Sequence, residues 1–371
     1  MKLAVISTVW FPLSHTDVIV TRWVEPYFTD SVHGWTKPSS TIASLYLEQI
    51  PANDMGRQFC AQHDIPIFDS VRSALTLGTD RLAVDGVLLI GEHGDYPLNE
   101  FRQKLYPRKR LFDAITAVFR ESGRAVPIFN DKHFSWDFSH SCEMFEVASE
   151  LGFALYGGSS LTHCPLDPGP PLHAGEEAVE ALALFHGDPD NYGFHSMEYA
   201  QSLVEVRRGG ETGIRAVRSF EGHAVRSALA ADEMPRDLLQ RALVHHGYPD
   251  TEDIISFILD RTEGLIAYQL EHRDGLRITH LLVPKFVGEW VVALKTKEGE
   301  VRSCHLLGGD GRDFFSNFAR LNARVEEFFQ SGTAPTPPLR THLVTGALQA
   351  ALQALKQGGA WVQTPQLTVA Y

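Results

Sequence analysis

The sequence predicts an α/β protein in which a doubly wound parallel sheet is followed by an α+β domain with a largely antiparallel, open sheet. Up to residue 158, short apolar runs alternate with longer helical patterns, which is typical of consecutive βαβ units. Beyond residue 159, runs of alternating polarity are joined by turn sequences such as RDG and KEGE, which favour antiparallel hairpins. A length of 371 residues suits two domains of these kinds.

The first domain is expected to alternate strands and helices from its first residues. Its last helix precedes Gly152, a residue type that commonly ends helices because it accepts the left-handed conformation. The predicted strands are 3–6, 42–47, 65–68, 86–90, 126–129 and 154–156, and the predicted helices are 16–25, 55–63, 99–122 and 139–151.

A segment rich in proline and glycine, HCPLDPGPPLHAG, marks the passage from the domain 1–158 to the domain 159–371. The last helix of the second domain, at about 341–357, is expected to pack back toward the first domain. The predicted strands are 213–220, 265–272, 277–284, 290–296 and 301–306, and the predicted helices are 176–185, 313–330 and 341–357.

Composition narrows the classes of partner. Acidic residues outnumber basic ones, 46 to 33, for a net charge of −13, which argues against a nucleic acid as the main partner. No apolar run approaches the about 20 residues of a membrane-spanning helix, and the N-terminal MKLAVISTVW leads directly into a predicted strand. The four cysteines are scattered, as expected of reduced thiols. These features predict a cytoplasmic protein that acts on a small molecule, with a homo-oligomer through the C-terminal sheet left open.

Three segments carry a resemblance to a known family. In VPIFNDKHFSW, the residues Asp131, Lys132 and His133 occupy the place of a Glu-Lys-Pro signature. In NYGFHSME, His195 matches a histidine that follows an aspartate by four residues, although Asn191 stands in the aspartate position. With the C-terminal THLVTGALQAALQALKQGGAWVQTP, these segments resemble the Gfo/Idh/MocA-like family, which includes glucose-fructose oxidoreductase and inositol dehydrogenase. The resemblance implies a Rossmann-like first domain, contact of Lys132 with substrate during proton transfer, and a proton-handling role for His195.

The turn after the first strand departs from the pattern of that family, Gly-x-Gly-x-x-Gly (or Ala)-x-x-His. Ser7, Val9 and Pro12 occupy the three small positions, while His15 keeps the last one. The glycines of such a turn let the backbone approach a pyrophosphate, and Pro12 also lacks an N–H that could bind an anion. The sequence therefore predicts that NAD or NADP binds weakly or not at all at this turn. If a nucleotide does bind, Glu48 matches the acidic residue that holds the adenosine ribose.

Histidines and carboxylates follow several strands of the first domain, at the edge where an open α/β sheet binds its ligands. These side chains are ligand types of Zn, Mn or Fe, and several carboxylates in one pocket would repel one another unless a cation were present. We therefore expect a divalent metal, with a metal-free hydrogen-bonded network around a polyol as the alternative. The expected ligands are Glu92, His93, Asp95, Asp131 and His133, and the expected catalytic residues are Lys132, His195 and His15.

The resulting hypothesis is a non-standard Gfo/Idh/MocA-like enzyme acting on a small polyhydroxylated or carboxylated substrate by metal-assisted acid/base chemistry of lyase, hydrolase or isomerase type. One alternative is an NAD(P)-dependent sugar or cyclitol oxidoreductase. The other is a non-catalytic binding or scaffold protein that kept the fold and lost the cofactor. The basic runs 108–110 and 207–208 are expected to be solvated surface.

Overall fold

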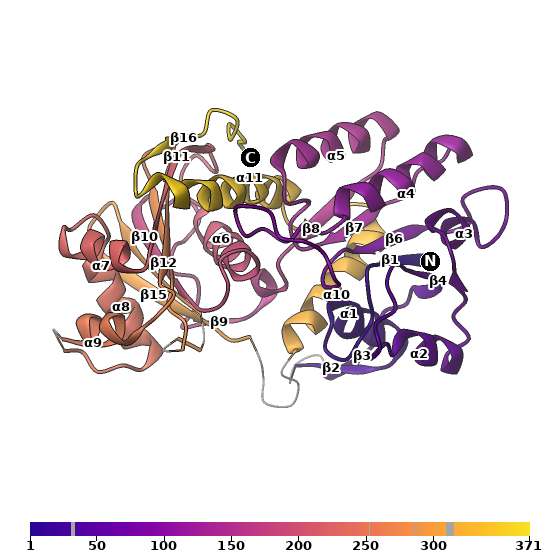
Figure 1. Ribbon diagram of the computed structural model, residues 1–371, viewed down its shortest axis with the longest axis horizontal. Helices are drawn as coiled ribbons and strands as arrows, with labels where there is room; N and C mark the ends of the chain where they lie inside the picture. The colour runs from indigo at the N-terminus through magenta and orange to yellow at the C-terminus, as the bar shows by residue number, and fades with distance from the viewer. Residues whose placement is uncertain (31–33, 252, 286, 289, 309–314) are drawn as a thin grey trace. The chain divides into compact units, whose positions relative to one another are not determined.

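The computed structural model describes residues 1–371 except 31–33, 252, 286, 289 and 309–314 (Figure 1). The chain divides into two compact units, each built from more than one segment. The first unit comprises Met1–Pro97, Lys104–His163 and Gly308–His342, and the second comprises Leu98–Gln103, Cys164–Leu307 and Leu343–Tyr371. The boundary predicted at residue 158 and the packing predicted for the last helix stay predictions.

Among the described residues, six parallel strands form the sheet of the first unit. The strands are β1 (Lys2–Ser7), β4 (Thr41–Leu47), β5 (Ile67–Phe68), β6 (Gly86–Ile90), β7 (Ile128–Asp131) and β8 (Leu155–Gly158). Their order is β5-β4-β1-β6-β7-β8, which confirms the predicted doubly wound sheet. The apolar β6 is buried along its whole length, as expected of a parallel strand covered on both faces.

Helices cover both faces of this sheet. They are α1 (His15–Val24), α2 (Gly56–Gln62), α3 (Val71–Thr76), α4 (Arg108–Ser122), α5 (Phe138–Leu151) and α10 (Ser316–Ser331), with a short 3-10 helix, η1 (Ser160–His163). Successive residues of β1 point to opposite faces. Leu3 and Val5 belong to a core that includes residues of α1 and α10, whereas Ala4 and Ile6 belong to a core that includes residues of α3, α4 and α5.

Several segments of the first unit differ from the sequence prediction, among them the short helix α3, which the sequence did not predict. The helix expected at 99–122 begins only at Arg108, because the Asn99 side chain accepts hydrogen bonds from the N–H groups of Phe101 and Gln103 and forms a turn. A hairpin that the sequence did not predict follows α1. Its strands are β2 (Tyr27–Asp30) and β3 (Gly34–Thr36).

Eight strands of the described chain form a mixed sheet in the second unit. They are β9 (Leu166–Asp167), β10 (Ala178–Phe185), β11 (Ile214–Glu221), β12 (Ile266–His272), β13 (Arg277–Leu282), β14 (Val291–Thr296), β15 (Val301–Leu306) and β16 (Val362–Gln363). Their order is β16-β11-β12-β13-β10-β14-β15-β9. Among these described strands only β10 and β13 pair in parallel, so the predicted, largely antiparallel sheet is confirmed.

The segment 176–185, predicted to be helical, contains the strand β10 instead. Its alanines and leucines favour a helix locally. However, β10 pairs with β13 on one side and β14 on the other, and its residues Ala181–Phe185 are completely buried. Pairing and burial therefore override local helix propensity, as they often do in central strands.

The remaining helices belong wholly or partly to the second unit. They are α6 (Asn191–Val204), α7 (His223–Ala230), α8 (Arg236–His246), α9 (Ile254–Arg261), α11 (Pro338–Ala354) and the 3-10 helix η2 (Leu355–Gln357). Apolar residues of α7, α8 and α9 share a core with Leu182 and Leu184 of β10. In the part of the chain that the structure describes, no helix combines the length and the apolar character needed to cross a membrane.

Candidate functional site

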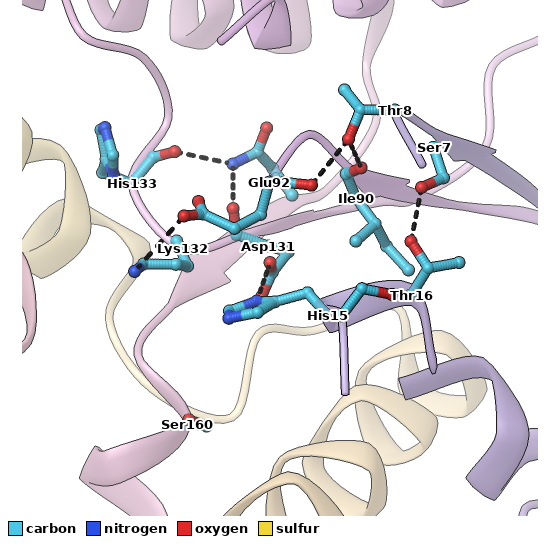
Figure 2. Close-up of polar contacts among 12 residues, drawn as sticks. Ser7, Thr8, His15, Thr16, Ile90, Glu92, Asp131, Lys132, His133 and Ser160 are labelled. Carbon is cyan, nitrogen blue, oxygen red and sulfur yellow. Dashed lines mark hydrogen bonds and ion pairs between the residues drawn. The ribbon is translucent and has the colours of Figure 1, made fainter. Parts of the chain in front are cut away.

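The carboxyl edge of the parallel sheet gathers side chains that the sequence analysis singled out. β1 pairs with β6, and β6 pairs with β7, so the segments that follow these strands meet at one edge. His15 begins α1, Glu92 follows β6, and Asp131 ends β7 just before Lys132. Figure 2 shows these four side chains gathered at this edge.

Glu92 is the centre of a buried ion-pair network. Its Oε2 accepts a hydrogen bond from Arg108 of α4, and its Oε1 lies 3.8 Å from Lys132 Nζ. The side chains of Glu92, Arg108 and Lys132 are only 2%, 0% and 3% exposed. Burial by itself would raise the pKa of Glu92, but the adjacent Lys132 and Arg108 outweigh burial and hold this pKa far below its ordinary value. Glu92 is therefore a carboxylate at neutral pH.

Arg108 is a site residue that the sequence analysis missed, because its basic run was expected to be solvated. It is completely buried, whereas Arg110 is largely exposed and pairs with Glu48. A signal was present in the sequence. Leu111 and Phe112 follow Arg108 at helical spacing and are buried, so Arg108 lies on the buried face of α4.

His15 and Asp131 form a second pair at this edge. His15 Nδ1 lies 2.5 Å from Asp131 Oδ2, and the two side chains are 14% and 1% exposed. The His15 ring stands edge-on to the ring of His93, with centroids 5.1 Å apart, and to the ring of Phe318, with centroids 5.0 Å apart. The carboxylate of Asp131 therefore has a protein partner from another element, as Glu92 does.

Two further histidines of the edge are uncharged at neutral pH. Burial, helped by the nearby His15, lowers the pKa of His93 to about 4. Burial, helped by Arg108, lowers the pKa of His133 well below its ordinary value. Within the described residues, no hydrogen-bond partner reaches the buried Nε2 of His93. The ionic character of the site therefore comes from the carboxylates and their basic partners.

The loop that carries His93 is held in a strained conformation. His93 has a left-handed φ of 67°, which is uncommon for a residue with a side chain. On one side, Thr8 Oγ1 donates a hydrogen bond of 2.7 Å to the carbonyl oxygen of Glu92. On the other, the Gln49 side chain makes two hydrogen bonds, of 2.9 and 3.1 Å, to the main chain of Asp95. Strain of this kind persists where the surroundings impose it, which is common at functional sites.

The predicted metal site is not supported, because the expected ligands are engaged elsewhere or lie apart. Across the described residues, no group of three or more side chains suited to hold a metal ion comes together. The expectation of a metal rested on carboxylates without partners, whereas the structure places Arg108 and Lys132 beside Glu92 and His15 within hydrogen-bond distance of Asp131. The ligands in question were Glu92, His93, Asp95, Asp131 and His133; of these, Asp95 is exposed.

The turn after β1 is closed by its own hydrogen bonds. Ser14 Oγ accepts hydrogen bonds from the N–H groups of Phe11, at 3.2 Å, and Asp17, at 3.3 Å. Asp17 Oδ2 accepts a further one from the N–H group of Leu13, at 2.8 Å. These are donors that the N-terminus of a helix would otherwise offer to a phosphate, and Asp17 adds a negative charge at the same place.

Side chains also fill the space inside this turn. Val9 and Trp10 are 1% and 0% exposed, and the ring of Trp10 lies 5.0 Å from the ring of Phe59. A Cβ atom added to Gly56 would lie only 3.0 Å from Trp10 Cβ, so the packing is tight. The residues of this turn therefore do not fit a pyrophosphate bound through the backbone; whether a dinucleotide binds stays a prediction.

Glu48, the residue expected to hold a ribose, is engaged by protein groups. It forms an ion pair with Arg110, and its side chain is 17% exposed. Tyr96 also lies beside it, since burial and then the charge of Glu48 raise the pKa of the Tyr96 phenol well above its ordinary value. A ribose would have to displace or share these partners.

His195 lies in the second unit, on α6. Asn191, four residues earlier, is tied to Asp188, whose Oδ1 accepts a hydrogen bond of 2.7 Å from the N–H group of Asn191. The His195 ring lies 6.0 Å from the ring of Tyr192. A role for His195 beside Lys132 stays a prediction, because the two residues belong to different units.

No protein-family model matches the chain, and no curated protein matches it in sequence. Solved structures of dehydrogenases nevertheless share its fold. GenD2 from gentamicin A biosynthesis, in complex with NAD, is 12% identical with a TM-score of 0.60, covering 98% of this chain and 97% of GenD2. The apo scyllo-inositol dehydrogenase from Lactobacillus casei is 10% identical with a TM-score of 0.57, covering 98% of each chain. The myo-inositol dehydrogenase from Corynebacterium glutamicum is 8% identical with a TM-score of 0.57, covering 97% of this chain and 98% of its own.

The fold is therefore that of two-domain dehydrogenases with a Rossmann-like first domain. The predicted resemblance to the Gfo/Idh/MocA-like family is confirmed at this level, since identities of 8–12% show the fold alone. The main functional hypothesis, metal-assisted lyase, hydrolase or isomerase chemistry, is wrong on this evidence. The similar structures are dehydrogenases, and the expected metal ligands do not assemble among the described residues.

Proposed function

We propose that this chain is an oxidoreductase that interconverts a hydroxyl and a carbonyl group on a sugar or cyclitol, with NAD(P) as its redox cofactor. The observation that carries this proposal is Lys132, buried beside Glu92 at the carboxyl edge of a dehydrogenase-like fold. Ligands of open α/β sheets bind at this edge. A lysine there is suited to bind the reacting oxygen and to assist the movement of its proton.

The cofactor is the part of this proposal that the structure fits least well. A nicotinamide would supply the hydride acceptor of the reaction. The turn after β1 does not fit the pyrophosphate of such a cofactor, because Ser14 and Asp17 occupy the N–H groups and Trp10 fills the interior. We therefore expect the dinucleotide to bind weakly, without the usual contribution from this turn.

The residues of the edge have separate tasks in this proposal. The Lys132 ammonium donates a hydrogen bond to the substrate oxygen and stabilises the negative charge that develops as the hydroxyl loses its proton. Glu92 holds Lys132 in place, and Arg108 shares the charge of Glu92. Lys132 is also held through its main chain, since its carbonyl oxygen accepts a hydrogen bond of 3.2 Å from the N–H group of Gly158. His15 and His195 are proposed as further proton-handling residues.

A second candidate function is a non-catalytic binding protein that kept the fold and lost the cofactor. The closed turn after β1 is the observation that favours it. The buried Lys132 and the strained loop of His93 favour an enzyme instead, because strain and buried charge reduce stability and are commonly retained where a function needs them.

The cellular setting of the protein is also a proposal. A cytoplasmic location agrees with four free cysteines and an acidic composition. For quaternary structure, we propose that the chain forms a homo-oligomer through its C-terminal sheet.

The proposal predicts dinucleotide-dependent oxidation of a polyol that requires Lys132. Inositols, aldoses and sugar alcohols are offered to the full chain with NAD or NADP, and formation of the reduced nicotinamide is followed by absorbance. Lys132→Ala should lower kcat/KM by roughly 10²–10³-fold, the usual contribution of a positioned donor that stabilises charge in the transition state. Lys109→Ala, on the partly exposed side of α4, is the matched control and should change little.

Two outcomes contradict the proposal. One is the absence of turnover throughout the panel at saturating dinucleotide, which favours the binding protein. The other is turnover that survives in Lys132→Ala with circular dichroism unchanged, which would place the reaction elsewhere.

A further inference from the structure

We infer that His15 and Asp131 form a proton-accepting pair, in which Asp131 orients the ring of His15 and His15 Nε2 receives the proton of the substrate hydroxyl. The inference rests on the proposed function and assigns the base of that reaction. Lys132 then acts as the group that stabilises the oxygen, so the two tasks fall to different side chains.

The first step of the argument is the orientation of the ring. The 2.5 Å contact joins His15 Nδ1 to Asp131 Oδ2, so in the neutral ring the proton lies on Nδ1 and is donated to the carboxylate. The lone pair is then on Nε2. A buried carboxylate in this position selects the tautomer and stabilises the imidazolium that forms when Nε2 takes a proton.

The second step is rigidity. Asp131 ends β7, where Asn130 holds the following turn through hydrogen bonds from Nδ2 to the carbonyl oxygens of Asp131, at 3.2 Å, and His133, at 3.0 Å. His15 is fixed from the other side, since its ring stands edge-on to His93 and Phe318. The pair is therefore preorganised by β7, α1 and α10 rather than formed by flexible surface side chains.

The third step is the availability of Nε2. Of the residues that the structure describes, none donates to or accepts from His15 Nε2, and the side chain keeps 14% of its surface exposed. Glu92 lies close enough for Lys132 and His15 both to act on its charge. The accepting nitrogen and the Lys132 ammonium thus both lie near the carboxylate of Glu92, and the inference places the substrate hydroxyl between them.

The chemical step is a simple proton transfer. The O–H bond of the substrate breaks, an N–H bond forms at His15 Nε2, and the electron pair stays on the oxygen beside the Lys132 ammonium. Asp131 remains a carboxylate and does not take the proton. Asp131 is accordingly a positioning residue, and His15 is the catalytic one.

The test combines a spectroscopic readout with turnover. Nitrogen-15 NMR of histidine-labelled full chain, with His15 assigned through His15→Gln, should show the proton of the neutral ring on Nδ1. Asp131→Asn should mix the two tautomers and lower kcat by roughly 10²–10⁴-fold, by analogy with other aspartate–histidine pairs, while KM changes little. The control Asp137→Asn, at the half-buried N-cap of α5, should leave both readouts as in wild type.

The outcomes separate this inference from the proposed function. A wild-type ring with its proton on Nε2 overturns the inference whatever the turnover. Turnover that is unchanged in Asp131→Asn and His15→Gln, but lost in Lys132→Ala, overturns the inference and leaves the proposed function standing. A wild type that fails with every polyol overturns the proposed function, and with it the assignment of His15 as the base. Carbethoxylation of His15 by diethyl pyrocarbonate, mapped by mass spectrometry, checks independently that Nε2 is accessible and carries the lone pair. A carbethoxylation rate that Asp131→Asn leaves unchanged would also contradict the pair.

Discussion

At the scale of single residues, charge compensation determines the character of the site. Glu92 and Asp131 are both almost completely buried; Glu92 pairs with the cations Arg108 and Lys132, and Asp131 is hydrogen-bonded to His15. A buried charge is tolerated only with partners of this kind, and removing one partner costs more than the pair contributes. Arg108 is therefore as necessary to the edge as the residues that would contact a substrate.

The first residue-scale prediction concerns Arg108. Arg108→Met should lower the free energy of unfolding by about 3–5 kcal/mol, because it leaves Glu92 buried with a single partner 3.8 Å away. The measurement is urea unfolding followed by circular dichroism. The matched control Arg110→Met removes an exposed ion pair with Glu48 and should cost at most about 1 kcal/mol. Equal losses of unfolding free energy in the two variants would contradict this prediction. Partial recovery of the unfolding free energy in Arg108→Met/Glu92→Gln would support it, because that variant no longer buries an unpaired carboxylate.

The second concerns the buried His280 of β13. Burial, followed by the charge of His272, lowers the pKa of His280 from 6.5 to about 3, and its Nδ1 lies 2.8 Å from Ser196 Oγ. Because the folded pKa is depressed, the contribution to stability is complete above about pH 6.5 and is lost as the pH falls toward the folded value. The free energy of unfolding of His280→Gln should therefore fall less steeply as the pH is lowered. Its slope against pH should be smaller than that of wild type by about 1.4 kcal/mol per pH unit within this window.

The check is urea unfolding at several pH values, with the exposed His173→Gln as the control. The control should keep the wild-type slope. A His280→Gln slope equal to wild type would show that this histidine is not held neutral by the fold.

At the scale of elements, the sequence predicts strands of the parallel sheet better than it predicts side-chain environments. The apolar runs of β1 and β6 are recognisable because both faces of these strands are buried. The adjacency of β1, β6 and β7 also follows from the doubly wound order, so the gathering of His15, Glu92 and Asp131 could be predicted. The altered residues of the first turn were likewise visible in the sequence.

Other features depend on distant contacts that no local pattern contains. The strand β10 has a helix-like composition and becomes a strand only through pairing with β13 and β14. Arg108 neutralises Glu92 across a separation of 16 residues, and His15 meets Asp131 across 116. The metal prediction was wrong because these contacts are distant in the sequence. The sequence shows the carboxylates but does not show which protein groups pair with them in the fold.

At the scale of the whole molecule, the fold resembles that of dehydrogenases, whereas the turn after β1 does not fit the pyrophosphate of a dinucleotide. The fold matches dehydrogenases along nearly the whole chain, including one in complex with NAD. The turn that would bind the pyrophosphate is filled by Trp10 and closed by Ser14 and Asp17. Weak binding of the dinucleotide, as proposed above, would reconcile the two observations. It would distinguish this chain both from a tightly loaded dehydrogenase and from a protein with no cofactor.

The most direct test is titration of the full chain with NADH and NADPH, followed by nicotinamide fluorescence. Loss of two hydrogen bonds to phosphate, at about 1.5–3 kcal/mol each, weakens binding by roughly 10²–10⁴-fold and moves a micromolar Kd to about 0.1–10 mM. We predict saturable binding of one dinucleotide in that range. Micromolar or tighter binding would contradict the closed turn. The absence of saturable binding for both dinucleotides up to tens of millimolar, roughly a few times the predicted upper limit, would contradict the assignment as an oxidoreductase.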